Sequence, residues 1–130
     1  MGPNFVLDKG FTVANGGAAW PIYRFCKFVT ETTVNQATAI TDICIGVNQD
    51  RLDAADSATG NAQTNVRLLG ITKIEAAGAI ALGAFVGPST NGRAQTAVTT
   101  QFRHGIAMQA AGGAGEWIDV LLTPVSGPAL

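Results

Sequence analysis

Charged side chains are scarce in this sequence. Asp, Glu, Lys and Arg make up 13% of its 130 residues, where about 25% is usual in a globular protein. The eight basic residues are scattered along the chain, so no cluster can neutralise a row of phosphates, and we expect no nucleic-acid partner. A small monomer usually needs more surface charge to stay soluble. The net charge of −1 therefore favours a protein that functions in an assembly.

Residues that commonly carry chemistry are also few. Cys26 and Cys44 form no CxxC motif, which excludes the usual zinc and thioredoxin patterns. We expect two buried reduced thiols, and a disulfide between them is the alternative if their strands align. The single histidine, His104, is interpreted as a hydrogen-bonded structural residue, because nucleophilic catalysis needs a base beside a nucleophile. We expect no enzymatic activity, no catalytic residue, no metal and no cofactor.

Three other features bear on possible partners. Asp50, Asp53 and Asp56 lack the spacing of a calcium-binding loop and predict a solvated acidic loop. The longest uncharged run, residues 76–92, is broken by glycine and proline, so we expect no membrane partner. Trp20 and Trp117 are interpreted as core or subunit contacts rather than as platforms for a ligand.

Short apolar runs alternate with turn signals about every ten to fifteen residues, which predicts an all-β fold. We expect a compact single-domain β-sandwich or barrel with short hairpins, the clearest of them at Asn91-Gly92. One helical turn is predicted near residues 52–55. The expected strands are 22–30, 38–47, 66–74, 80–86, 94–98, 105–110 and 116–123.

The predicted organisation has three parts. Residues 1–20 form an extended N-terminal arm and the first turn, residues 21–124 form the β-rich domain, and residues 125–130 form a loose tail after Pro124. The apolar run Phe5–Leu7 has two interpretations of equal weight. It is either an arm that adds a strand to a neighbouring molecule or a first strand within its own fold.

Six segments of the C-terminal two thirds occur in a distinctive order and spacing. They are Asp53–Gly60, Val66–Ile71, Ala76–Val86, Thr90–Ala94, Gly105–Ala111 and Gly115–Leu122. Through them, the region from about Asp50 to Thr123 resembles the capsid decoration, or head cement, proteins of tailed bacteriophages. The first 48 residues match that pattern less well.

The resemblance implies a structural virion protein made in the host cytoplasm. It would bind the outer surface of the capsid, often as a homotrimer at a local symmetry axis, and stabilise the capsid by bridging subunits of the major capsid protein. No catalytic or metal-binding residue is carried over. We expect contacts with the capsid or with another copy at Asn4, Phe5 and Leu7 in the arm, and at Trp20.

A second hypothesis is a small β-barrel module that binds a glycan or another ligand on the virion. Such a module needs a concave site lined by aromatic side chains with convergent polar groups. The sequence holds six Phe, two Trp and one Tyr, and the core will take most of them.

Overall fold

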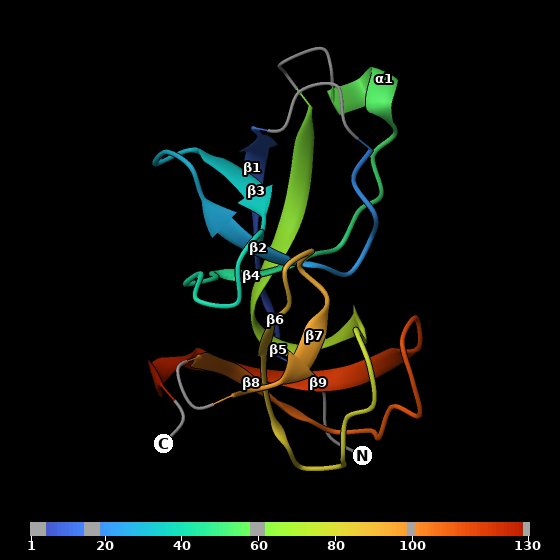
Figure 1. Ribbon diagram of the computed structural model, residues 1–130. Coiled ribbons are helices and arrows are strands. Elements are labelled where there is room, and N and C mark those ends of the chain that lie inside the picture. The colour runs from blue at the N-terminus through green and yellow to red at the C-terminus, as the bar shows by residue number, and fades with distance from the viewer. Residues whose placement is uncertain (1–4, 15–18, 58–61, 99–100, 129–130) are drawn as a thin grey trace.

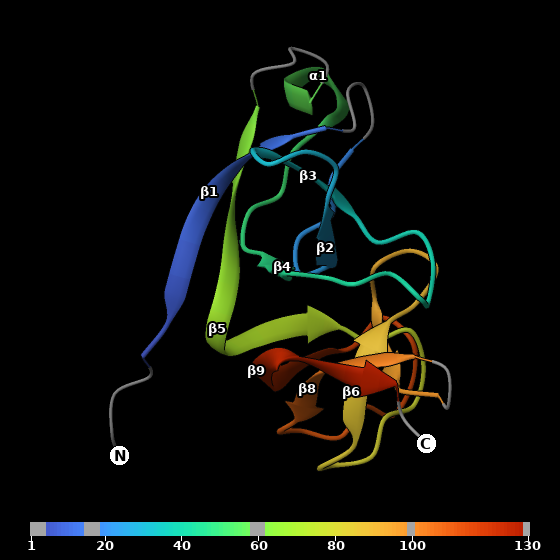
Figure 2. The ribbon, with the colours of Figure 1, turned by 90° about the vertical axis from the view of Figure 1, so that its left-hand side faces the viewer.

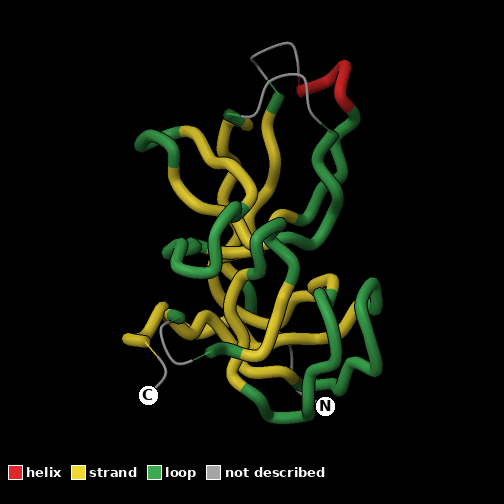
Figure 3. Tube along the Cα trace, in the orientation of Figure 1, coloured by secondary structure: helices red, strands yellow, loops and turns green. Residues whose placement is uncertain are grey.

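The fold is all-β, as predicted. The computed structural model describes residues 5–14, 19–57, 62–98 and 101–128, and Figures 1 and 3 show the arrangement of the strands. Within these residues one sheet contains nine strands. Their bounds are β1 Leu7–Val13, β2 Phe25–Phe28, β3 Thr33–Gln36, β4 Gly46–Asn48, β5 Gln63–Glu75, β6 Phe85–Pro88, β7 Ala94–Thr96, β8 Phe102–Ala107 and β9 Trp117–Pro128, and the one-turn helix α1 spans Ala54–Ser57.

The first four strands and the first half of β5 close into a ring, which we call the N-terminal ring. The strand order is β1-β3-β2-β4-β5, and β1 pairs again with β5 along Leu7–Thr12. Closing a sheet on itself removes exposed strand edges. Buried side chains from the strands and from the loop between β1 and β2 fill the ring, among them Phe11, Trp20 and Val34.

The second half of β5 begins another ring, which we call the C-terminal ring. Its order is β5-β9-β8-β6-β7. A bridge between Ala76, just after β5, and Ala94, at the start of β7, brings the last strand back to the first. The predicted Asn91-Gly92 hairpin is confirmed, because β6 and β7 pair across it and Gly92 has a positive φ of 79°.

A bend in β5 joins the rings, and Figure 2 shows it clearly. Residues 63–69 of β5 pair with β1, and residues 70–75 pair with β9. Gly70 lies at the change of partner with a φ of +105°, which residues with a side chain rarely adopt. A Cβ at this position would lie 2.7 Å from the carbonyl oxygen of Phe5 and 2.8 Å from Cγ1 of Val6.

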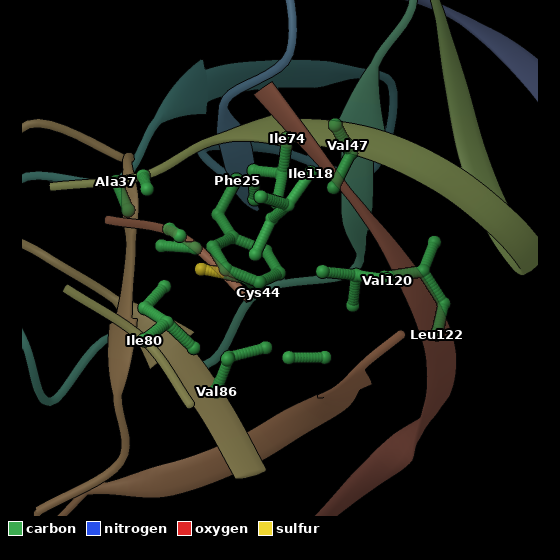
Figure 4. Close-up of a cluster of buried hydrophobic side chains, with 14 residues drawn as sticks. Phe25, Ala37, Cys44, Val47, Ile74, Ile80, Val86, Ile118, Val120 and Leu122 are labelled. Carbon is green, nitrogen blue, oxygen red and sulfur yellow. The ribbon is translucent and has the colours of Figure 1, made fainter. Parts of the chain in front are cut away.

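The rings are also joined by a shared hydrophobic core (Figure 4). Phe25 on β2 is fully buried against residues of the C-terminal ring, including Ile74, Val86 and Val120. Its backbone N–H donates to the carbonyl of Gly92 at 2.7 Å, which ties β2 to the β6–β7 hairpin. The orientation of one ring relative to the other is therefore fixed by both packing and covalent continuity.

Several strand boundaries differ from the sequence predictions. The run 22–30 is a strand only over β2, since Tyr23 has a positive φ of 63°. Most of the run 38–47 is a loop that leads into the short β4. The strand β3 was not predicted, because its sequence Thr-Val-Asn-Gln has a single apolar residue.

Two of the predicted chain segments are corrected. Within the expected arm, residues 1–20, the stretch 7–13 forms β1 and contributes to the fold, because β1 pairs with both β3 and β5. The expected loose tail, residues 125–130, begins inside β9, which continues to Pro128. Pro124 does not end the strand, because the pairing of β8 with β9 shifts register between Arg103 and Gly105. An irregularity of this kind accommodates a proline that has no N–H to donate.

Replacing Gly70 should destabilise the whole fold. A Gly70→Ala variant would combine an unfavourable φ with a clash against the backbone of Phe5, so we expect a loss of about 2 kcal/mol in the free energy of unfolding. Urea denaturation followed by circular dichroism measures this loss. Gly78→Ala is the matched control, since a Cβ at Gly78 meets nothing within 4 Å. Equal stability of the two variants would contradict the role given to Gly70.

Candidate functional site

Phe5, Val6 and Leu7, the first residue of β1, form an exposed apolar stretch near the start of the described chain. Phe5 is 83% exposed, and Val6 and Leu7 are 43% and 51% exposed. Phe5 and Val6 lie against Gly70 at the bend in β5. Asn4, the remaining predicted contact residue of the arm, lies outside the described residues. Phe5 and Leu7 therefore have the exposure that their predicted contact role requires.

Trp20, in contrast, is a core residue. Its side chain is 1% exposed and packs in the N-terminal ring, and its backbone pairs with that of Leu52 in both directions, at 2.7 and 3.0 Å. The prediction that Trp20 contacts a partner is therefore not retained, and the interpretation of Trp20 as a core residue is confirmed. Sequence alone does not separate these roles, because buried and interfacial tryptophans look alike in a pattern.

An apolar groove of about 390 Å³ opens at the end of the N-terminal ring nearest the bend. Phe11 and Phe28 meet edge to face there, with 5.7 Å between ring centroids, and the Lys9 ammonium lies 5.3 Å from the centroid of Phe11. Phe28 and Ile43 are each more than half exposed. The full lining is Lys9, Phe11, Phe28, Ile43, Cys44, Ile45, Leu68 and Thr123.

The groove exists because the ring is incomplete at this end. Strands β1 and β3 pair only at Thr12–Thr33 and Val13–Val34. Among the described strands, none pairs with residues 7–11 of β1 on the side away from β5. An unpaired strand edge beside apolar side chains is a typical site for the addition of another strand.

A second apolar surface lies on the outside of the C-terminal ring. Cross-strand pairs connect Ile71 to Leu121, Leu121 to Ile106, and Ile106 to Phe85. We call these four residues the apolar row. Because paired residues share one face of a sheet, they form a continuous line across β5, β9, β8 and β6. Phe85 and Leu121 are 47% and 39% exposed.

Charged side chains flank the apolar row. Lys73 and Asp119 pair across β5 and β9 with 3.3 Å between Nζ and Oδ1, and the Arg103 guanidinium lies 5.0 Å from the centroid of the Phe85 ring. An outward face of an antiparallel sheet is normally polar, and contiguous exposed apolar patches mark interaction sites. The apolar row is therefore a second candidate for contact with a partner.

A polar and aromatic cluster lies where the two rings meet. Tyr23 packs edge-on against Trp117, which is 52% exposed, with 5.0 Å between ring centroids. Beside them, the Glu75 carboxylate accepts from Arg24 at 3.2 Å and from Arg93 at 3.3 Å. The carboxylate and both guanidinium groups are thus engaged with one another, and only the exposed Trp117 ring presents a free surface to a ligand.

His104 has a structural role in its surroundings, as predicted. The buried imidazole accepts a hydrogen bond at Nε2 from the backbone N–H of Cys44 at 2.9 Å, and Nδ1 lies 3.2 Å from the Phe102 carbonyl. Nδ1 therefore carries the proton. The ring joins β8 to the loop that forms one wall of the groove.

Both cysteines are buried free thiols, as expected. Burial raises the pKa of Cys26 to about 12 and raises the pKa of Cys44, with the neighbouring Cys26 and Asp42 adding to the effect. A thiol is nucleophilic only when it ionises. In the described part of the chain, no group of His, Cys, Asp or Glu side chains could hold a metal ion, and no helix is long and apolar enough to cross a membrane.

Comparisons with known proteins agree at the level of fold. No known family model matches the chain, and no curated protein matches it. Among solved structures, it is similar to the N base of the head fiber gp8.5 of bacteriophage phi29, with a TM-score of 0.67. The match covers 97% of this chain and 98% of that chain at 16% sequence identity. The two chains share one fold from end to end.

Stability should decrease in mild acid through His104. Burial lowers the pKa of His104 below its usual value of 6.5, although the contact with the Phe102 carbonyl acts in the opposite direction. The unfolded chain takes up a proton near pH 6.5 and the folded chain only at lower pH. The contribution of neutral His104 is thus complete above pH 6.5 and is lost as the pH falls toward the folded pKa.

This is measured by NMR, because the sequence has one histidine and therefore one imidazole signal to titrate. We expect a midpoint below 6.5 in the folded protein. We also expect a smaller loss of stability between pH 7 and pH 5 in a His104→Gln variant, whose amide does not titrate. A midpoint at or above 6.5 would contradict the buried neutral imidazole.

Proposed function

We propose that the protein is a structural component of a bacteriophage virion. In this proposal it binds the outer surface of the capsid and stabilises it by bridging subunits of the major capsid protein. The observation that carries the proposal is the end-to-end likeness in fold to the base of a phage head fiber. The resemblance of residues 50–123 to capsid decoration proteins is a separate line of support, because it comes from sequence.

The surface chemistry supports a function by binding rather than by catalysis. Within the described residues, both thiols are buried with raised pKa values, and the one imidazole is buried and hydrogen-bonded on both nitrogens. Three exposed surfaces to which no structural role has been given are apolar: the segment before β1, the groove and the apolar row. Surfaces of this kind fit other proteins.

We further propose that the protein functions as a homotrimer. An oligomer on a capsid needs one surface for its own copies and another for the capsid subunits. The chain has two separate apolar surfaces, one on each ring, and this division suits such an arrangement. Several weak capsid contacts made at once by a trimer would then give tight attachment.

The apolar row is the surface that we assign to the capsid. Phe85→Asp and Leu121→Asp place a carboxylate on exposed positions of the C-terminal ring without altering its core. We expect each to weaken attachment to capsids that lack the protein by roughly tenfold or more, which corresponds to about 1.4 kcal/mol. Co-sedimentation with such capsids measures the effect.

Gln63→Asp is the matched control, because Gln63 is an exposed residue at the far end of β5. It should bind as the unaltered protein does, and circular dichroism should show the same fold in all three variants. Normal attachment of both the Phe85→Asp and Leu121→Asp variants would remove the apolar row from the proposal. Failure of the unaltered protein to co-sediment would contradict the proposed function itself.

A glycan- or ligand-binding module is the second candidate, and one observation favours it. Trp117 is 52% exposed and lies beside Tyr23, and exposed indole rings stack well on apolar faces of ligands. The surrounding Arg24, Glu75 and Arg93 side chains bond to one another. Binding on a glycan array that is abolished by Trp117→Ala would support this candidate over capsid attachment.

A further inference from the structure

The open end of the N-terminal ring has the form of a site for an extended apolar peptide. The unpaired edge of β1 over residues 7–11 offers backbone donors and acceptors, and Gly10 on this edge has no heavy atom within 4 Å of an added Cβ. The groove beside this edge is lined by apolar side chains, and Lys9 is the one charged residue of its lining. In strand addition, main-chain hydrogen bonds give affinity and side-chain pockets give specificity.

The segment that precedes β1 matches this site in length and chemistry. Phe5 and Val6 are uncharged, apolar and exposed. Five residues of β1 extend over about 17 Å, and the six residues before β1, extended, span up to about 20 Å. The groove lining contains one charged side chain, Lys9, so it suits a peptide without charged side chains. Residues 1–6 contain no charged side chain.

The segment does not reach the groove of its own chain. Leu7 pairs with Leu69, while Lys9 and Leu68 line the groove. Phe5 and Val6 lie against Gly70 at the bend, and neither they nor Leu7 belong to the lining of the groove. The occupant of the groove must therefore come from another molecule.

We propose that the segment before β1 of one copy adds as a strand to the open edge of β1 in a second copy and places Phe5 and Val6 in its groove. The inference rests on the homo-oligomer of the proposed function and names its interface. The segment and the groove are different surfaces, so the contact is heterologous. A heterologous contact repeated by rotation closes into a ring, as a trimer requires.

Disulfide trapping between two single variants tests the exchange. A Val6→Cys protein and an Ile43→Cys protein are coexpressed and oxidised mildly, and the products are separated on a non-reducing gel. We expect the mixed disulfide between the two variants to dominate, because Ile43 lines the groove. Pairing Val6→Cys with Thr96→Cys, an exposed residue of β7, is the control and should give little product. The unaltered protein, whose two cysteines are buried, should give none.

The contradicting results are distinct. A Val6→Cys protein that links only to itself indicates a symmetric contact and overturns the proposal, as does equal linking to the Ile43 and Thr96 variants or no linking at all. If the protein binds capsids but forms no mixed disulfide, the proposed interface is wrong and the proposed function stands. If the mixed disulfide forms but the protein does not bind capsids, the proposed interface stands and the proposed function is wrong.

A truncated protein gives a second readout. Deleting residues 1–6 removes the segment and leaves the β1–β5 pairing, which begins at Leu7. A deletion through residue 9 would remove part of β1 and test the fold instead. We expect sedimentation velocity to show oligomers for the full chain and monomers for the truncated chain, with unchanged circular dichroism. Oligomers of the truncated chain would overturn the proposal.

Discussion

One strand shared by two rings is the constraint on which the rest of the structure depends. The strand β5 supplies an edge to the N-terminal ring through residues 63–69 and an edge to the C-terminal ring through residues 70–75. The change of partner requires a backbone conformation that Gly70 can adopt. The buried Phe25 then fixes the angle between the rings, because it belongs to one ring by its backbone and to the core of the other by its side chain.

This arrangement determines where apolar surface is left over. Closure removes most strand edges, but β3 is short, and so one edge of β1 remains unpaired next to the bend. The groove lies at that gap. On the C-terminal ring, alternation places Ile118 and Val120 in the core and Leu121 outside, where it joins the apolar row. The two surfaces are held in fixed relation by the shared strand, which suits a protein that has to contact its own copies and a larger assembly together.

Sequence patterns predicted the all-β class and the elements with regular alternation. The segments around β5 and β9 and the Asn91-Gly92 hairpin were found because local chemistry determines them. The short strand β3 and the irregular stretch around Tyr23 were not, because long-range pairing decides them. The continuation of β9 beyond Pro124 depends on a register shift in its partner β8, which no local pattern reveals. Of the site, the sequence identified the exposed Phe5 and Leu7, but it placed the buried Trp20 there too.

The groove and the apolar row could not be predicted from the sequence, again because long-range strand pairing decides them. Phe28, Ile43 and Phe85 look like core residues in a pattern, and only the closure of the two rings leaves them exposed.

The central claim is that the molecule acts by repeated contact between these surfaces and their partners on a virion. Electron cryomicroscopy of capsids incubated with the protein tests it most directly. The account predicts ordered density on the outer surface, with the C-terminal ring against the capsid and a connection between neighbouring copies at the groove. Capsids without added density, or with isolated copies that touch the surface through the N-terminal ring, would contradict it.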